Sequence, residues 1–159
     1  QMCIRDRGYN TGGFSVSVTD YWFSYHKEDG GYTGDYFKYG AHSTVHIFEA
    51  TLGYDFGPLA LSWNTYFAGD DYTKENGDRA YSTYVGISAP FKLGGLDWSA
   101  EVGLTPWEGA YANKFNVTNL TLKAEKEIKF TNSFSLPTFA QVTFNPHTQG
   151  AYFVFGVSF

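Results

Sequence analysis

The sequence predicts an all-β fold built from antiparallel strands, and three observations support this. Apolar and polar residues alternate with a period of two along most of the chain. Clusters of Gly, Pro, Asn and Asp divide the alternating segments from one another. Aromatic residues make up 20% of the chain and charged residues only 17%, below the roughly 25% charge of ordinary soluble domains. We therefore expect short strands whose faces carry many rings and few charges.

The interruptions of the alternating pattern predict eight strands and their connections. The strands are expected at residues 14–25, 44–55, 59–68, 80–91, 96–105, 115–129, 134–144 and 151–159. Short connections, at residues 56–58, 92–95 and 131–133, alternate with long ones, at residues 26–43, 70–79 and 106–114. Short turns on one rim and long loops on the other are typical of outer-membrane β-barrels.

The side-chain phase predicts one apolar and one polar face. Between residues 59 and 68, Leu61 and Trp63 share one phase, whereas Ser62 and Asn64 share the other. The later strands repeat this division, and it predicts the direction of each side chain in a barrel. The residues expected to point outward are Leu61, Trp63, Val102, Leu122, Phe153 and Phe155. Those expected to point to the lumen are Ser62, Asn64, Glu101, Lys123 and Glu125.

Two charged residues depart from this division. Asp20 lies in the apolar phase of its strand, and we interpret it as a β-bulge after which Tyr21, Phe23 and Tyr25 turn outward. Lys126 also lies in an apolar phase, but it is close enough to the short-turn rim for its ammonium group to reach water.

Aromatic residues collect at the strand ends and predict contact with a membrane. They are Tyr54, Phe56, Phe91, Trp98 and Phe130 near the short turns, and Trp107 and Phe144 near the long loops. Two such bands are typical of the aromatic girdles at the two membrane interfaces. We therefore expect an antiparallel transmembrane β-barrel. A soluble β-sandwich or lipocalin-like barrel is the alternative, because its strands alternate in the same way.

Composition excludes other classes. No stretch approaches the roughly 20 apolar residues of a membrane-spanning helix, which excludes a helical membrane protein. The net charge is −5 and no cluster of Lys and Arg is present, which argues against a nucleic-acid partner.

The first seven residues differ from the rest of the chain. They contain Met2 and Cys3, the only methionine and cysteine, and they show no strand alternation. We interpret residues 1–7 as a non-native leader that arose by translated sequencing read-through, and residues 8–159 as a single outer-membrane β-barrel domain. Gly8 to Asn10 are expected to end a preceding strand before a tight turn at Thr11 to Gly13. We accordingly expect these eight strands to be the C-terminal portion of a larger barrel of about twelve.

The chain also resembles known outer-membrane proteins. Its last eight residues, Tyr152 to Phe159, resemble the C-terminal signature of that superfamily, an alternating strand closed by an aromatic residue, with Phe155, Val157 and Phe159 in one phase. The resemblance implies recognition by the barrel-assembly machinery. Residues 54–59, 89–98 and 155–156 are similar to the TorF-type porin family, and the similarity runs from about Gly8 to the end. It implies the outer membrane of a Gram-negative bacterium, contact with its lipid and lipopolysaccharide, and a pore.

Charged residues in the inward phase indicate the function. They are Glu49, Asp97, Glu101, Lys123, Glu125 and Glu127. Inside a barrel they either line a water-filled pore and bias ion passage, or form ion pairs that hold a narrow barrel together. We expect a porin or passive channel of unknown cargo, without catalytic residues, metal or cofactor. The alternatives are a structural, non-conducting barrel, a lipocalin-like ligand-binding barrel and an outer-membrane lipid-modifying enzyme.

Histidines near the long loops are the candidates for that enzyme. They are His26, His42, His46 and His147, and Ser43 and Ser82 are among the serines at the same rim. A Ser-His-acid arrangement needs a specific geometry, so we expect ordinary loop histidines. His42 and His46 are four positions apart, which on a strand separates them by roughly 13 Å, too far for one metal ion.

Overall fold

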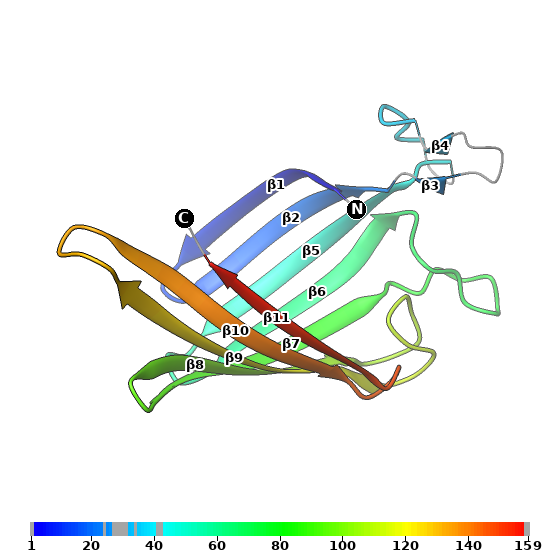
Figure 1. Ribbon diagram of the computed structural model, residues 1–159. Helices are drawn as coiled ribbons and strands as arrows, with labels where there is room; N and C mark the ends of the chain where they lie inside the picture. The colour runs from blue at the N-terminus through cyan, green and yellow to red at the C-terminus, as the bar shows by residue number, and fades with distance from the viewer. Residues whose placement is uncertain (1, 24, 27–31, 34, 41–42, 158–159) are drawn as a thin grey trace.

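The chain folds into one large antiparallel sheet and one small hairpin (Figure 1). The computed structural model describes residues 2–23, 25–26, 32–33, 35–40 and 43–157. The large sheet consists of β1 (Met2–Thr11), β2 (Phe14–Trp22), β5 (His46–Asp55), β6 (Ala60–Gly69), β7 (Thr83–Leu93), β8 (Leu96–Thr105), β9 (Asn116–Lys129), β10 (Ser135–Asn145) and β11 (Gly150–Val157). The hairpin pairs β3 (Tyr25–His26) with β4 (Tyr32–Thr33). Within these residues no helix is long and apolar enough to span a membrane.

Each strand of the large sheet pairs with the next strand of that sheet along the chain, as in a β-meander, and the β3–β4 hairpin lies between β2 and β5 in the sequence. The sheet is strongly curled, but its edge strands β1 and β11 are not neighbours, so it is not closed into a barrel (Figure 1). The prediction of an all-β antiparallel fold is confirmed. All eight expected strands are present, with boundaries within three residues of those predicted over the described part of the chain.

The short and long connections lie at opposite ends of the sheet (Figure 1). Two of the short turns have glycine at both central positions. Gly12 and Gly13 have φ of 53° and 85°, and Gly94 and Gly95 have φ of 62° and 76°. Consecutive positive φ angles are what a two-residue type I′ hairpin requires, and its twist matches that of the flanking strands. These glycines therefore fix the register of β1 with β2 and of β7 with β8.

One expectation about the first strands is confirmed and another is wrong. Gly8 to Asn10 end a strand that precedes β2, and this strand begins at Met2, which pairs with Trp22. The non-native origin of residues 1–7 stays a prediction. No bulge occurs at Asp20, because β2 pairs with β5 without interruption; the irregularity lies in β1, between Cys3 and Arg5. The side chain of Asp20 therefore keeps the regular alternation of β2. The strand ends at Trp22, before Tyr25.

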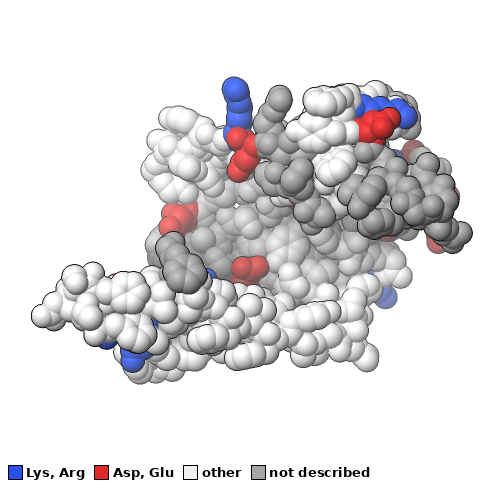
Figure 2. Space-filling model, turned by 45° about the horizontal axis from the view of Figure 1, so that its top comes forward, with Lys and Arg blue, Asp and Glu red and all other residues white. Residues whose placement is uncertain are grey.

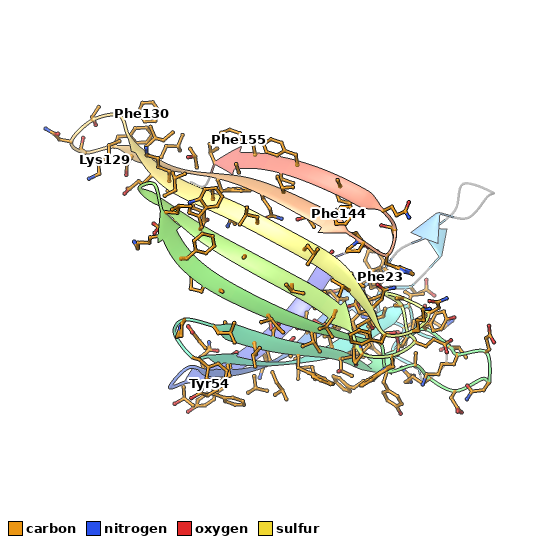
Figure 3. The ribbon with its side chains drawn as sticks, turned by 90° about the horizontal axis from the view of Figure 1, so that it is seen from below. Phe23, Tyr54, Lys129, Phe130, Phe144 and Phe155 are labelled. Atoms are coloured by element: carbon orange, nitrogen blue, oxygen red, sulfur yellow. The ribbon has the colours of Figure 1, made fainter. Side chains whose placement is uncertain are left out.

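The two faces of the sheet differ in side-chain size and polarity. The six residues expected to point outward share the convex face, and Tyr54 and Phe155 show its direction, away from the enclosed space (Figure 3). The concave face carries small residues where strands curl most closely. A Cβ at Gly103, for example, would overlap the hydroxyl of Tyr84. Because the side chains are small on the concave face and large on the convex face, the sheet can curl.

Few hydrophobic side chains are buried in the described part of this single curled sheet. Among the described residues the buried hydrophobic ones are Ile47, Tyr66, Ala80 and Ala112. The buried polar ones are Thr19, Asp20, Thr44, His46, Glu49, Ser82, Thr83, Thr105 and Thr118. The polar groups are thus better covered than the large apolar side chains, which is the reverse of the usual arrangement in a soluble domain.

Replacing Gly95 by Val should destabilise the β7–β8 hairpin, because a β-branched residue is strained at φ of 76°. We expect the free energy of unfolding to fall by about 1–2 kcal/mol. Gly95→Asn is the matched control, because Asn tolerates this conformation and should cost less. Urea-induced unfolding of both variants measures the difference, and equal losses would contradict the assignment of the turn.

Candidate functional site: the concave polar face

The concave face gathers polar side chains from most strands of the large sheet, and it is therefore the candidate site. The molecule is hollowed along this face, with acidic side chains in the hollow (Figure 2). Pairing in the ladder places Glu101 opposite Thr121, Lys123 opposite Ser99, and Glu125 opposite Asp97. Predicted lumen residues from β8 and β9 are therefore brought together on one face.

At the long-loop end, this face carries a group that we name the acid–tyrosine cluster. Its members are Tyr21, Glu49, Tyr66, Tyr84, Glu101 and Tyr111. The hydroxyl of Tyr21 donates to Glu49 at 3.1 Å, and that of Tyr84 donates to Glu101 at 2.9 Å. Glu49 also stands directly opposite Tyr66 in the ladder between β5 and β6. The two carboxylates are thus held by phenol groups.

Tyr111 reaches this cluster from the connection between β8 and β9. Its hydroxyl donates to that of Tyr66 at 3.1 Å, and its ring lies 5.8 Å from that of Tyr84. Burial raises the pKa of Tyr111 well above its ordinary value, and the hydrogen bond to Tyr66 and the nearby Glu49 charge act in the same direction. The phenol therefore stays neutral and remains a hydrogen-bond donor at physiological pH. Sequence reasoning missed Tyr111, because nothing in the pattern shows that its loop folds inward.

On β9 and β10 the concave face carries neutral polar groups and one ion pair. Thr121 and Thr143 share a hydrogen bond of 3.0 Å. The ammonium of Lys123 lies 2.7 Å from Glu125 and 5.0 Å from the centre of the Phe139 ring. The charge of Lys123 is therefore matched locally by Glu125.

At the short-turn rim the remaining predicted charges are more exposed. Lys92 and Asp97 form an ion pair of 2.8 Å with both side chains largely in solvent. Glu127 accepts a hydrogen bond from Ser135 on a hairpin that overhangs β8, since the pairing of β8 with β9 stops at Glu125 while β9 and β10 continue to Lys129 (Figure 3). These residues lie at the edge of the concave face, away from the acid–tyrosine cluster.

The predicted interface aromatics occupy both ends of the sheet. At the short-turn end the ring pairs are Tyr54 with Phe56, Phe91 with Trp98, and Phe130 with Phe134. At the long-loop end Trp107 lies 5.9 Å from Trp63, and Phe144 is exposed on β10. In β11, Phe155 and Val157 are exposed, whereas Phe159 lies outside the described residues.

A buried ion pair lies on the convex side at the long-loop end. Nδ1 of His46 lies 2.8 Å from the Asp20 carboxylate, and its Nε2 lies 2.8 Å from the carbonyl oxygen of Tyr36. Both ring nitrogens of His46 therefore face hydrogen-bond acceptors. The ring of Tyr39 packs against the imidazole of His46, with 4.3 Å between the two ring centres. His46 is thus a structural residue rather than an exposed loop histidine, and the departure of Asp20 from the apolar pattern was its signal in the sequence.

The other candidates for enzymatic chemistry are not brought together in the described part of the chain. Ser82 is fully buried, and its hydroxyl donates to Asp71 and accepts from the backbone N–H of Ala110. His147 contacts Asn116. His42 and the side chain of His26 lie outside the described residues. Ser82 therefore serves to hold two loops together.

Comparison of the chain with protein-family models, curated proteins and solved structures finds no match. The resemblance to the TorF-type porin family therefore stays a prediction.

Replacing His46 by Ala should leave the Asp20 carboxylate buried without its ionic partner. Removal of one partner of a buried ion pair costs about 3–5 kcal/mol, so we expect a clear loss of stability in urea unfolding. The double variant Asp20→Val/His46→Leu should recover much of this loss, because no charge is then buried. His147→Ala is the control, and a loss as small as that of the control would contradict the structural role of His46.

Proposed function

We propose that this chain forms the wall of a passive, water-filled channel in a bacterial outer membrane. The single observation that carries this proposal is the reversed distribution of the two faces: the convex face is largely apolar and, away from the Asp20–His46 pair, uncovered, whereas the concave face is polar. In a membrane barrel the outer face contacts lipid and the inner face contacts water. A soluble lipocalin-like barrel requires the opposite arrangement, with its apolar residues enclosed.

The extent of the exposed apolar surface supports lipid as its covering. Leu122 in the middle of β9 is 44% exposed, and Phe153 and Phe155 on β11 are 70% and 66% exposed. Contiguous exposed apolar patches larger than a few hundred Å² are rare in soluble monomers. Lipid would remove this surface from water, and the aromatic pairs at the two ends of the sheet would lie at the membrane interfaces.

A membrane location places one requirement on the edges of the sheet. Unpaired backbone N–H and C=O groups are not tolerated in lipid, so β1 and β11 would have to pair with each other or with further strands. The number of strands also sets the width of the lumen, because about eight strands leave an interior that side chains fill, whereas more strands leave room for water. Membrane lipid, lipopolysaccharide and the barrel-assembly machinery are the partners that this proposal includes.

A structural, non-conducting barrel is the second candidate. The ion pair of Lys123 with Glu125 and the packed acid–tyrosine cluster favour it, because such contacts would hold a narrow interior together. The two candidates share the membrane location and differ only in whether water and ions pass.

Two measurements test the proposal in sequence. The chain extracted in detergent should show heat-modifiable mobility in gel electrophoresis, as folded membrane barrels do, and a soluble protein should not. Reconstituted in planar bilayers, it should then give single-channel currents. Heat-modifiable mobility without current at any voltage would favour the non-conducting barrel, and the absence of both would contradict the membrane location.

Arg substitutions on the two faces of β9 should differ in cost. Leu122→Arg places a charge on the convex face and should lower the free energy of unfolding from lipid vesicles by about 2–4 kcal/mol. Thr121→Arg is the matched control, because Thr121 lies on the concave face opposite Glu101 and loses only its hydrogen bond with Thr143. Urea-dependent unfolding from phospholipid vesicles measures both. Equal effects would contradict lipid contact of the convex face.

A further inference from the structure

An apolar groove crosses the convex face near the short-turn end of the sheet. It has a volume of about 320 Å³, which is within the range of sites that bind small molecules. Four neighbouring strands, β2, β5, β6 and β7, contribute to it. The apolar and aromatic side chains that line it are Phe14, Leu52, Tyr54, Leu61, Trp63 and Val85.

Two rings that bound the groove are each held by a partner outside it. On the short-turn side, the ring centre of Tyr54 lies 4.5 Å from that of Phe56, and Tyr54 points away from the enclosed space (Figure 3). On the long-loop side, the indole N–H of Trp63 donates to the Thr65 hydroxyl at 2.7 Å, and its ring contacts Trp107. These partners keep the gap between the two rings open.

The position of Trp63 is fixed by a chain of hydrogen bonds that ends on the backbone. The hydroxyls of Thr65 and Thr83 share a hydrogen bond of 2.9 Å. Thr83 is fully buried, and its hydroxyl donates to the carbonyl oxygen of Tyr81 at 2.8 Å. The groove is therefore formed before anything occupies it, and a preformed site loses little conformational freedom when it is filled.

The lining of the groove favours an apolar occupant. The described residues that line it carry no charge. Ser62 also belongs to the lining, but its hydroxyl accepts a hydrogen bond from Asn64, which projects from the same polar face. The phenol of Tyr54 belongs to the aromatic band at the short-turn end, where the headgroup region of a membrane would lie. An occupant therefore makes apolar contacts along the groove and meets a hydroxyl near the rim.

We propose that this groove is a binding site for one acyl chain of a phospholipid, whose headgroup lies at the aromatic band of the short-turn end. The inference rests on the proposed membrane location. Such a chain differs from the lipid around the rest of the convex face, because it occupies a single saturable site. Lipid tails are as apolar as Leu, so the preference for the groove comes from fit: an unfilled groove forfeits the dispersion contacts of its walls.

Retention of lipid by the folded chain tests the site. Wild-type chain folded in detergent and supplied with dimyristoyl phosphatidylcholine should carry one phospholipid in native mass spectrometry. Leu52→Phe should lower the fraction that carries lipid by roughly tenfold, because added volume in a fitted cavity excludes the occupant. Leu122→Phe is the matched control and should retain lipid as the wild type does. It makes the same substitution on the convex face of β9, where Leu122 is 44% exposed and Leu52 on β5 is 48% exposed.

A second variant and a second lipid complete the experiment. Val85→Phe fills the groove from β7, and it should also lower retention if Leu52→Phe does not fold. Heat-modifiable mobility verifies the folding of every variant. Myristic acid, supplied separately, has the same hydrocarbon chain without the phospholipid headgroup, and we expect it to be retained less well than the phospholipid.

The outcomes separate this inference from the proposed function. Wild-type chain without heat-modifiable mobility would contradict the membrane location and the inference together. Folded chain that retains no phospholipid, or that retains it equally in both Phe variants of the groove, would overturn the site while leaving the membrane location standing. Better retention of myristic acid would overturn the choice of phospholipid. A dimer that Leu52→Phe dissociates would show that a second copy of the chain covers the groove, and this too would overturn the proposal.

Discussion

The continuous ladder of backbone hydrogen bonds is the constraint on which the rest of this structure depends. A single curled sheet has no second layer to pack against, and only a few apolar side chains are buried within the described residues. Most long-range contact is therefore contact between neighbouring strands. The glycine turns fix the register of the ladder, and register in turn decides which side chains share a face.

The curl of the sheet follows from unequal side-chain volumes on its two faces. Glycine and serine on the concave face allow strands to approach, whereas Leu, Phe and Trp occupy the larger convex surface. Gly103 is one such position, because any Cβ there would displace Tyr84 from its hydrogen bond with Glu101. The same residues that bend the sheet therefore position the polar groups of the candidate site.

The long loops complete both faces at one end of the sheet. On the convex side, residues 36–39 cover the ion pair of Asp20 and His46, which an exposed apolar face could not otherwise accommodate. On the concave side, Tyr111 joins phenols and carboxylates that come from five strands. In each case a loop supplies groups that strands separated in sequence cannot provide for themselves. The hydrogen bonds between buried or partly buried polar side chains are for this reason concentrated at the long-loop end of the sheet.

The sequence by itself determined eight strands of the large sheet, the parity of their connections and the two-faced character of the sheet, because a period of two and paired glycines are local properties of the chain. Only the tertiary structure decided that Asp20 pairs with His46 instead of marking a bulge, that Tyr111 enters the concave side, and that Ser82 holds loops together. Those contacts join residues from 11 to 45 positions apart. No local pattern encodes which loop folds inward, because that depends on the shape and chemistry of the rim that the assembled strands present.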